Sequence, residues 1–153
     1  PCYFNGRVKN TKAHQLAMPV VYYSPITFLD WYDLPDVYKG EKELDFWKHC
    51  PTVWDESKAL AGEIGEYIIQ ARRTGNDWFV GAMNGLQARD ITLNTADFLQ
   101  KGKKYRVEIY NDDPFLQTRT KVSSTVVNVK AGKQLKLHLQ ASGGAALRFV
   151  MNN

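Results

Sequence analysis

Hydrophobic and polar residues alternate along most of the second half of the chain, from about residue 66 onward. In the run KKYRVEIYND, Tyr105, Val107 and Ile109 alternate with more polar neighbours, and KQLKLHLQ places three leucines opposite polar side chains. A period of two is the pattern of a strand with one buried face. Both segments are therefore predicted to be half-buried β-strands.

Five further segments of the second half have the composition of strands. They are EYIIQARR (66–73), DWFVGAM (77–83), RDITLNT (89–95), SSTVVNVK (123–130) and ALRFVMN (146–152). Turn-forming sequences such as TGND, NDDP, KAGK and SGG separate them. Seven short strands with regular turn signals predict an antiparallel β-sandwich of about 90 residues.

The first part of the chain has a different pattern, in which prolines separate segments of helical character from one strand-like run. NTKAHQLA (10–17) and GEKELDFWKHC (40–50) predict helices, from their capping residues and the spacing of their apolar positions. PVVYYSP (19–25) is a short apolar run between prolines and predicts a strand buried on both faces, as in a parallel sheet. The order helix, strand, helix is a slice of an α/β fold.

The change of period marks a predicted domain division. WDESKALAGEIG (54–65) is interpreted as the link, with Gly62 and Gly65 allowing backbone angles that other residues resist. The expected fold is mainly β, an antiparallel sandwich preceded by a helix-containing segment.

Charge and composition exclude some classes of partner. The 20 basic and 16 acidic residues give a net charge of +4, and the basic runs ARR (71–73) and QKGKKYR (100–106) are each followed by acidic residues. Such runs are typical of a solvated surface rather than of a groove for single-stranded nucleic acid, so we expect no nucleic-acid partner. No apolar run reaches the roughly 20 residues of a membrane span, and we expect no membrane partner either. Cys2 and Cys50 lie far apart and are predicted to be free thiols.

The stretch most like a binding site is FLDWYDLPD (28–36), which follows the predicted parallel strand. Ligands gather at the carboxyl ends of parallel strands, and aromatic rings stack on the apolar faces of sugars. Trp31, Tyr32 and Asp33 are therefore the candidate substrate-binding residues, with Asp30 beside them. In the alternative interpretation the aromatic side chains pack between elements and the aspartates cap a loop.

Other candidate motifs point to structure rather than to chemistry. His14, His49 and His138 fall in unrelated segments without metal-ligand spacing. His138 alternates with leucines and is expected to face solvent, while His14 could face a core or a cleft. Asp112 and Asp113 in NDDP are interpreted as a turn rather than a calcium loop. No catalytic or metal-binding residue is predicted.

The runs PTVWDES, GEYIIQARR and DWFVGAMN, together with AHQLAMPVVYYSPITFLDWYDLP, resemble the C-terminal part of glycoside hydrolase family 97, the α-glucosidases and α-galactosidases of Bacteroidetes. The resemblance covers essentially the whole chain. It implies that residues 1–56 are the end of a catalytic (β/α)8 barrel and that residues 57–153 are the C-terminal antiparallel β-sandwich domain, which supports the barrel.

The resemblance also implies what the intact enzyme does. Its members hydrolyse terminal α-linked glucose or galactose from oligosaccharides, with calcium bound near the substrate, and a periplasmic location is implied with them. The catalytic and calcium-binding carboxylates of the family belong to the upstream barrel strands and the N-terminal domain, and none matches a position here. The fragment alone is expected to be inactive and to bind no cofactor.

Two further expectations concern what the segments do on their own. Without neighbouring barrel strands, residues 1–56 are expected either to fold irregularly against the sandwich or to pair with another copy. The alternative function is an independent carbohydrate-binding module, for which Tyr110, on the polar face beside Glu108, is a better candidate than Trp78, whose strand is apolar on both faces.

Overall fold

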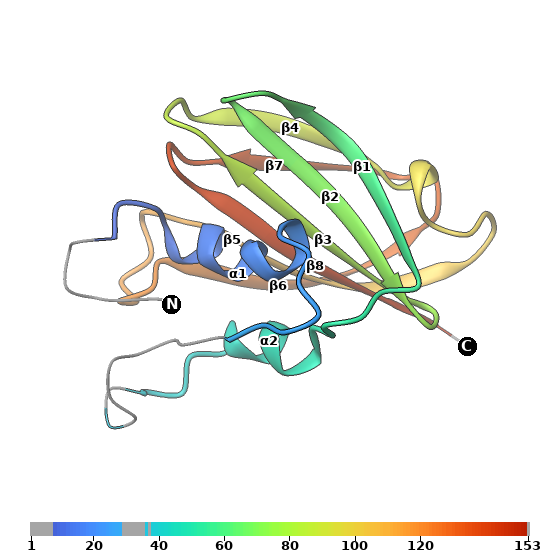
Figure 1. Cartoon of the computed structure of the whole chain (residues 1–153), viewed down its shortest axis with the longest axis horizontal. Helices are drawn as coiled ribbons and strands as arrows, with labels where there is room; N and C mark the ends of the chain where they lie inside the picture. Colours follow the sequence, from blue (N-terminus) through green and yellow to red (C-terminus); the bar gives the residue numbers. More distant parts are fainter. Residues whose placement is uncertain (1–7, 29–35, 37, 153) are drawn as a thin grey trace.

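The computed structural model describes residues 8–28, 36 and 38–152 and arranges them in three layers (Figure 1). The central layer is a six-stranded sheet with the order β1-β2-β3-β8-β5-β6, and the second is a two-stranded sheet, β4-β7. Two helices, α1 and α2, cover the other face of the large sheet. Every strand pair is antiparallel.

The helices are α1 (Lys12–Val21) and α2 (Leu44–His49), and a short 3-10 turn, η2 (Thr95–Asp97), follows β4. The strands are β1 (Glu56–Glu63), β2 (Tyr67–Thr74), β3 (Asp77–Asn84), β4 (Arg89–Asn94), β5 (Lys104–Asp112), β6 (Val122–Lys130), β7 (Gln134–Leu139) and β8 (Gly144–Met151). The seven predicted strands and the antiparallel sandwich are thus confirmed.

The segment interpreted as a link, residues 54–65, is instead mostly strand β1. It pairs with β2 over most of its length, with a register shift between Ala59 and Ala61. Burial alternates from Glu56 to Ala61, but the more sheltered positions include the charged residues Glu56 and Lys58, so the sequence shows no apolar period of two here.

The predicted parallel strand 19–25 is also wrong, because its first residues belong to α1. Ala13, Leu16, Ala17 and Val20 are fully buried, and their spacing is that of one helix face. A proline inside a helix costs about 3 kcal/mol. Burying Leu16 and Val20 contributes roughly 1.5 to 3 kcal/mol each, which offsets that cost and keeps Pro19 helical.

The larger core lies between the two sheets. Trp78, Phe98 and Phe149 form a chain of edge-to-face contacts, with ring centroids 5.5 Å apart for the first pair and 5.1 Å for the second. Val107 and Leu139 pack into the same core and are fully buried. Trp78 is therefore a core residue, as its strand pattern predicted.

A second core lies between the large sheet and the helices. The ring of Phe46 on α2 lies 5.7 Å from that of Phe79 and 5.8 Å from that of Tyr110. Tyr110 is only 4% exposed, so it is not the exposed glycan-binding residue that the polar face of its strand suggested. Burial raises the pKa of its hydroxyl to about 12. The helices cover the face that alternation alone assigns to solvent.

Two glycines allow α1 to lie directly on the sheet. A Cβ atom at Gly81 of β3 would stand 2.8 Å from the carbonyl oxygen of Ala17, and one at Gly144 of β8 would stand 2.7 Å from the Cα of His14. Real Cβ atoms essentially never come this close. This close-contact surface on β3 and β8 is called the helix seat below.

Of the two expectations for residues 1–56, packing against the sandwich is the one that the described part of this segment shows. The packing is through the two regular helices α1 and α2, which the expectation of an irregular fold did not include. Within the described residues, neither helix has the length and apolar character that a membrane span requires.

We predict that Gly81→Ala lowers the free energy of unfolding by roughly 1 to 3 kcal/mol, because the added methyl group forces α1 away from β3. In an ordinary strand the same substitution would stabilise the protein, since glycine lowers strand stability. Urea denaturation of both proteins measures the difference.

Ala59→Val is the matched control, because it adds methyl groups at an exposed position of β1 that no helix covers. We expect a change within about 0.5 kcal/mol for it. Equal urea midpoints for Gly81→Ala and the unchanged protein would contradict the close contact between α1 and Gly81.

Candidate functional site

The substrate-binding residues predicted from the sequence, Trp31, Tyr32 and Asp33, lie outside the described residues, as does Asp30. Asp36 is described and is exposed. What the structure does describe is the segment that leads from α1 toward them and the contacts that hold α1 in place.

This segment carries a row of exposed hydrophobic side chains. Tyr22, Tyr23 and Ile26 are more than half exposed, and Phe28 is 85% exposed. Large apolar side chains gathered in one place usually mark a surface that contacts another molecule or domain.

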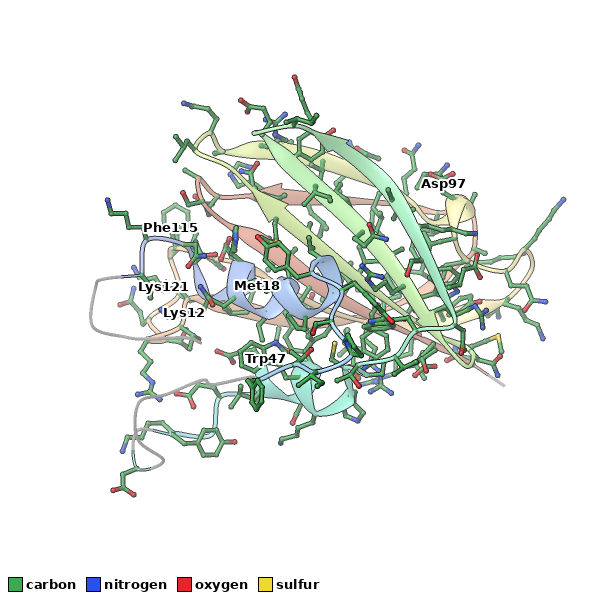
Figure 2. The ribbon with its side chains drawn as sticks, in the orientation of Figure 1. Lys12, Met18, Trp47, Asp97, Phe115 and Lys121 are labelled. Atoms are coloured by element: carbon green, nitrogen blue, oxygen red, sulfur yellow. The ribbon has the colours of Figure 1, made fainter. Side chains whose placement is uncertain are left out.

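A hollow of about 210 Å³, called the aromatic hollow here, lies beside the row. Met18 lines it from α1 and Trp47 lines it from α2 (Figure 2). The other residues around it are Gln15, Pro19, Tyr22, Ser24, Ile26, Thr27 and Phe28. A mainly apolar lining with a few hydroxyl and amide groups suits the apolar face of a sugar or side chains of a neighbouring domain.

Ser24 sets the course of the chain after α1. Its hydroxyl donates to the carbonyl of Ile26 (2.5 Å) and accepts from the Ile26 amide (3.3 Å). The hydroxyl of Thr27 donates to the carbonyl of Ser24 at 3.3 Å. Local bonds of this kind fold a segment without a helix or a sheet.

The start of α1 is tied to β5 and β8 by polar groups. Thr11 caps the helix, its hydroxyl accepting from the amide of His14 at 3.1 Å. The Asp112 carboxylate accepts from the Gly144 amide at 2.8 Å and is also bonded to the Thr11 side chain and the Ala13 amide. A carboxylate at a helix N-terminus also interacts favourably with the helix dipole.

Asp112 is 7% exposed. Its burial raises the pKa of the carboxyl group, and its hydrogen bonds lower this pKa by a smaller amount, so the net shift is upward. Asp113, by contrast, accepts from the amide of Phe115 at 3.0 Å in an exposed turn. The turn interpretation of NDDP is therefore correct for Asp113 but wrong for Asp112, which ends β5 and bonds the start of α1.

His14 has a structural role in the described chain. Its Nδ1 lies 2.9 Å from the carbonyl oxygen of Gly143, and a carbonyl can only accept, so Nδ1 carries the proton. Burial lowers the pKa of the imidazole. A neutral His14 thus donates to the β7–β8 turn and holds the helix to it.

Arg72 holds the other end of α1. Its Nε donates to the carbonyl of Val20 at 2.5 Å, its Nη2 to that of Val21 at 3.3 Å, and its Nη1 to the hydroxyl of Ser57 at 2.6 Å. Its guanidinium also lies 5.3 Å from the ring centre of Tyr23. ARR was interpreted as solvated surface, and this is wrong for Arg72, which is 8% exposed.

Among the described residues, His138 and Cys50 show no catalytic arrangement, and Cys2 lies outside the described part of the chain. His138 faces away from the leucines of β7, as predicted, and its Nδ1 lies 2.6 Å from a carboxylate oxygen of exposed Asp90. Cys50 is a free thiol, and burial raises its pKa to about 12, so it stays protonated. No group of three or more His, Cys, Asp or Glu side chains in the described part of the chain could hold a metal ion.

The helix seat is the feature that the sequence interpretation missed. The signal was a glycine inside a strand at Gly81 and the pair Gly143 and Gly144, which was interpreted as an ordinary hairpin turn. A glycine inside a strand often marks the close approach of another backbone.

Comparison with known families identifies the chain. The family model described as "Glycosyl-hydrolase 97 C-terminal, oligomerisation" matches residues 53–150, which include most of β1 to β8. The chain belongs to glycoside hydrolase family 97.

The matches to similar proteins cover 92 to 100% of this family 97 chain, but those proteins extend well beyond it. It is 37% identical over 151 residues to a retaining alpha-galactosidase of Bacteroides thetaiotaomicron, covering 97% of this chain and 22% of that protein. It superposes with a TM-score of 0.87 and 34% identity on a family 97 enzyme of Pseudoalteromonas sp. strain K8 in complex with acarbose, covering 100% of this chain and 26% of that one. A β-arabinopyranosidase has a TM-score of 0.72 at 29% identity, over 92% of this chain and 21% of its own length. The chain spans about a quarter of these relatives.

For this family 97 chain we predict that Arg72→Met lowers the free energy of unfolding by about 2 to 3 kcal/mol, because it leaves the last carbonyls of α1 unbonded beneath the surface. Arg106→Met, which removes a half-exposed guanidinium paired with Glu108, is expected to cost less than about 1 kcal/mol. Urea denaturation compares them. If Arg72→Met lowers the free energy of unfolding no more than Arg106→Met does, the bonds from Arg72 to the end of α1 contribute little to stability.

We also predict a pH-dependent effect of Asp112→Asn. Because burial raises the pKa of Asp112, the folded protein binds this proton more tightly than the unfolded chain, whose carboxyl has the ordinary pKa of 3.8. The stabilisation that comes from this tighter proton binding is fully present below pH 3.8 and is lost as pH rises through the raised pKa. The asparagine variant has no such proton, so its unfolding free energy should rise relative to that of the unchanged protein across this window.

Urea midpoints of both proteins between about pH 3 and 7 measure this difference. Asp113→Asn, in the exposed turn, is the control and should change the pH dependence much less. A difference for Asp112→Asn that falls or stays constant with rising pH would contradict the prediction.

Proposed function

We propose that this chain is the C-terminal part of an α-glycosidase that removes terminal α-linked glucose or galactose from oligosaccharides. The observation that carries the proposal is the 37% identity to a retaining alpha-galactosidase over 97% of the chain. The superposition on an enzyme in complex with acarbose supports it.

The proposed division is that residues 1–56 complete a (β/α)8 barrel and residues 57–153 form the sandwich that supports it. In this arrangement the upstream part of the barrel covers the exposed side chains of Tyr22, Tyr23 and Phe28, which otherwise face water. The sandwich fixes α1 through the helix seat, and α1 fixes the segment that leads to residues 31–33. Trp31, Tyr32 and Asp33 remain our candidate substrate-binding residues.

The same proposal extends to the cofactor and the location of the longer enzyme. Calcium bound near the substrate and a periplasmic location both follow from the family resemblance. The described residues of this chain do not fit a calcium site, since they contain no cluster of three or more acidic, histidine or cysteine side chains. Because the resemblance places the family's calcium-binding carboxylates in upstream parts of the enzyme, we propose that calcium binds outside this chain.

A second proposed role is oligomerisation, which the description of the matched family names. By contrast, the buried positions of Trp78 and Tyr110 remove both residues that were considered for an independent carbohydrate-binding module.

Hydrolysis of aryl α-glucosides and aryl α-galactosides by the 153-residue chain, beside a longer protein that contains it, tests the enzymatic proposal. We expect turnover from the longer protein alone, with rates differing by about 1,000-fold or more. Glycoside hydrolysis needs two carboxyl groups held at a defined separation across the bond, and we expect the barrel upstream of this chain to supply them.

Both samples are assayed in buffer that contains calcium. A second assay after removal of calcium by a chelator tests whether the longer protein depends on it. Hydrolysis by the purified 153-residue chain would overturn the division of labour. Failure of the longer protein on both classes of glycoside would overturn the α-glycosidase proposal itself.

A further inference from the structure

The large sheet ends in two edge strands of opposite character. Its outer strands are β1 and β6, each paired on one side only among the described strands. Unpaired backbone groups along such an edge can bind another strand, and natural proteins usually protect them with charges, prolines or bulges. The two edges therefore need separate treatment.

Edge β1 carries this protection. Its register shifts between Ala59 and Ala61, which bends the strand. Glu56, Lys58 and Glu63 place charges along it, and Lys58 pairs with Glu56 at 3.2 Å. An approaching strand would have to desolvate these charges and match a bent edge.

Edge β6 lacks these features. Nine residue pairs join it to β5 without a register shift, from Val122 opposite Asp112 to Lys130 opposite Lys104. Residues 122–129 contain no charged residue and no proline. All five residues from 124 to 128 are exposed.

Apolar side chains are exposed on both faces of this edge. Val126 is 54% exposed and Val127 is 38% exposed, and successive residues of a strand point to opposite faces. Val122 packs into the core beneath the helices and Val129 into the core between the sheets, so Val126 lies on the helix side and Val127 on the β4-β7 side. A straight, uncharged edge with valine on each face is suited to pairing with another strand.

We propose that β6 pairs antiparallel with β6 of a second copy of this chain, in a register centred on Val126, so that the two large sheets become one continuous sheet. This inference rests on the oligomerisation role proposed above and names the surface that performs it. It is separate from the hydrolytic activity.

The sequence of β6 is compatible with its own antiparallel copy. In the proposed register Ser124 lies opposite Asn128 of the second copy, and Val126 lies opposite its own equivalent. The lysine at position 130 lies opposite Val122, so no two lysines of the strand face each other. Like charges directly opposite each other would destabilise a pair, whereas apolar β-branched pairs stabilise it.

The first test measures the molecular mass of the 153-residue chain by size-exclusion chromatography with light scattering, over about 5 to 500 μM, a range suited to a contact of modest area. The monomer has a mass of 17.5 kDa, and we expect the mass to rise toward twice that value with concentration. Val126→Lys should weaken the dimer by roughly tenfold or more, because it replaces a valine pair by two facing ammonium groups.

Ala59→Lys is the matched control, since it places a lysine at an exposed position of the other edge. We expect its dimer to be as strong as that of the unchanged chain. Because position 126 is exposed, Val126→Lys should keep its circular dichroism spectrum and its urea midpoint, and both are measured for each variant.

A charge-exchange experiment tests the register. Val126→Lys and Val126→Glu are each expected to be weakened alone, and an equimolar mixture should associate again, because position 126 of one copy then meets the opposite charge on the other. Ala59→Lys mixed with Ala59→Glu should show no such recovery.

The possible outcomes distinguish a failure of the β6 contact from a failure of the proposed oligomerisation role. A chain that stays monomeric at every concentration overturns both the oligomerisation role and the β6 contact. A dimer that Val126→Lys leaves intact, or that Ala59→Lys weakens equally, retains the role and overturns the β6 contact. A mixture that fails to reassociate overturns the register centred on Val126.

Discussion

The close contact between the backbone of α1 and strands β3 and β8 is the constraint on which the rest of this structure depends. Only a residue without a Cβ atom fits at Gly81 and Gly144, where one would stand 2.8 Å or less from the helix backbone. Because the helix lies this close, Leu16 and Val20 are fully buried and the large sheet has a core on both faces. The helix layer is therefore part of the sandwich's own packing rather than an addition to it.

Charged groups at the two ends of α1 complete this contact. Asp112 accepts from the Ala13 amide at the start of the helix, and Arg72 donates to carbonyls at its end, which matches the sign of the helix dipole at each end. Both side chains are nearly buried, so each loses hydration that its hydrogen bonds must replace. The raised pKa of Asp112 shows that this replacement is incomplete. The contact fixes the helix in position as well as holding it to the sheet.

The sequence predicted the elements whose signal is local and missed those decided by distant partners. Alternation and strand-like composition together predicted seven strands, because each has residues in the core between the sheets. It could not predict that helices cover the other face, and so Tyr110 was placed in solvent. The run at residues 19–25 has strand composition, but Gly81 and Gly144, more than 60 positions away, decide that its start is helical. The candidate residues 31–33 lie outside the described chain, so their prediction stays open.

The described carboxylates are bonded in ways that fit the supporting role proposed for the sandwich better than a catalytic one. Glu56 pairs with Arg73, Glu66 with Arg89 and Asp77 with Arg148, so these charges tie strands together. A general acid needs a raised pKa, and burial gives Asp112 one. Yet its oxygens accept from the amide of Ala13 in α1 and from that of Gly144 in β8, and only 7% of the residue is exposed. The same burial that perturbs this carboxyl group commits it to holding the helix, and through the helix the segment that leads to the proposed sugar site.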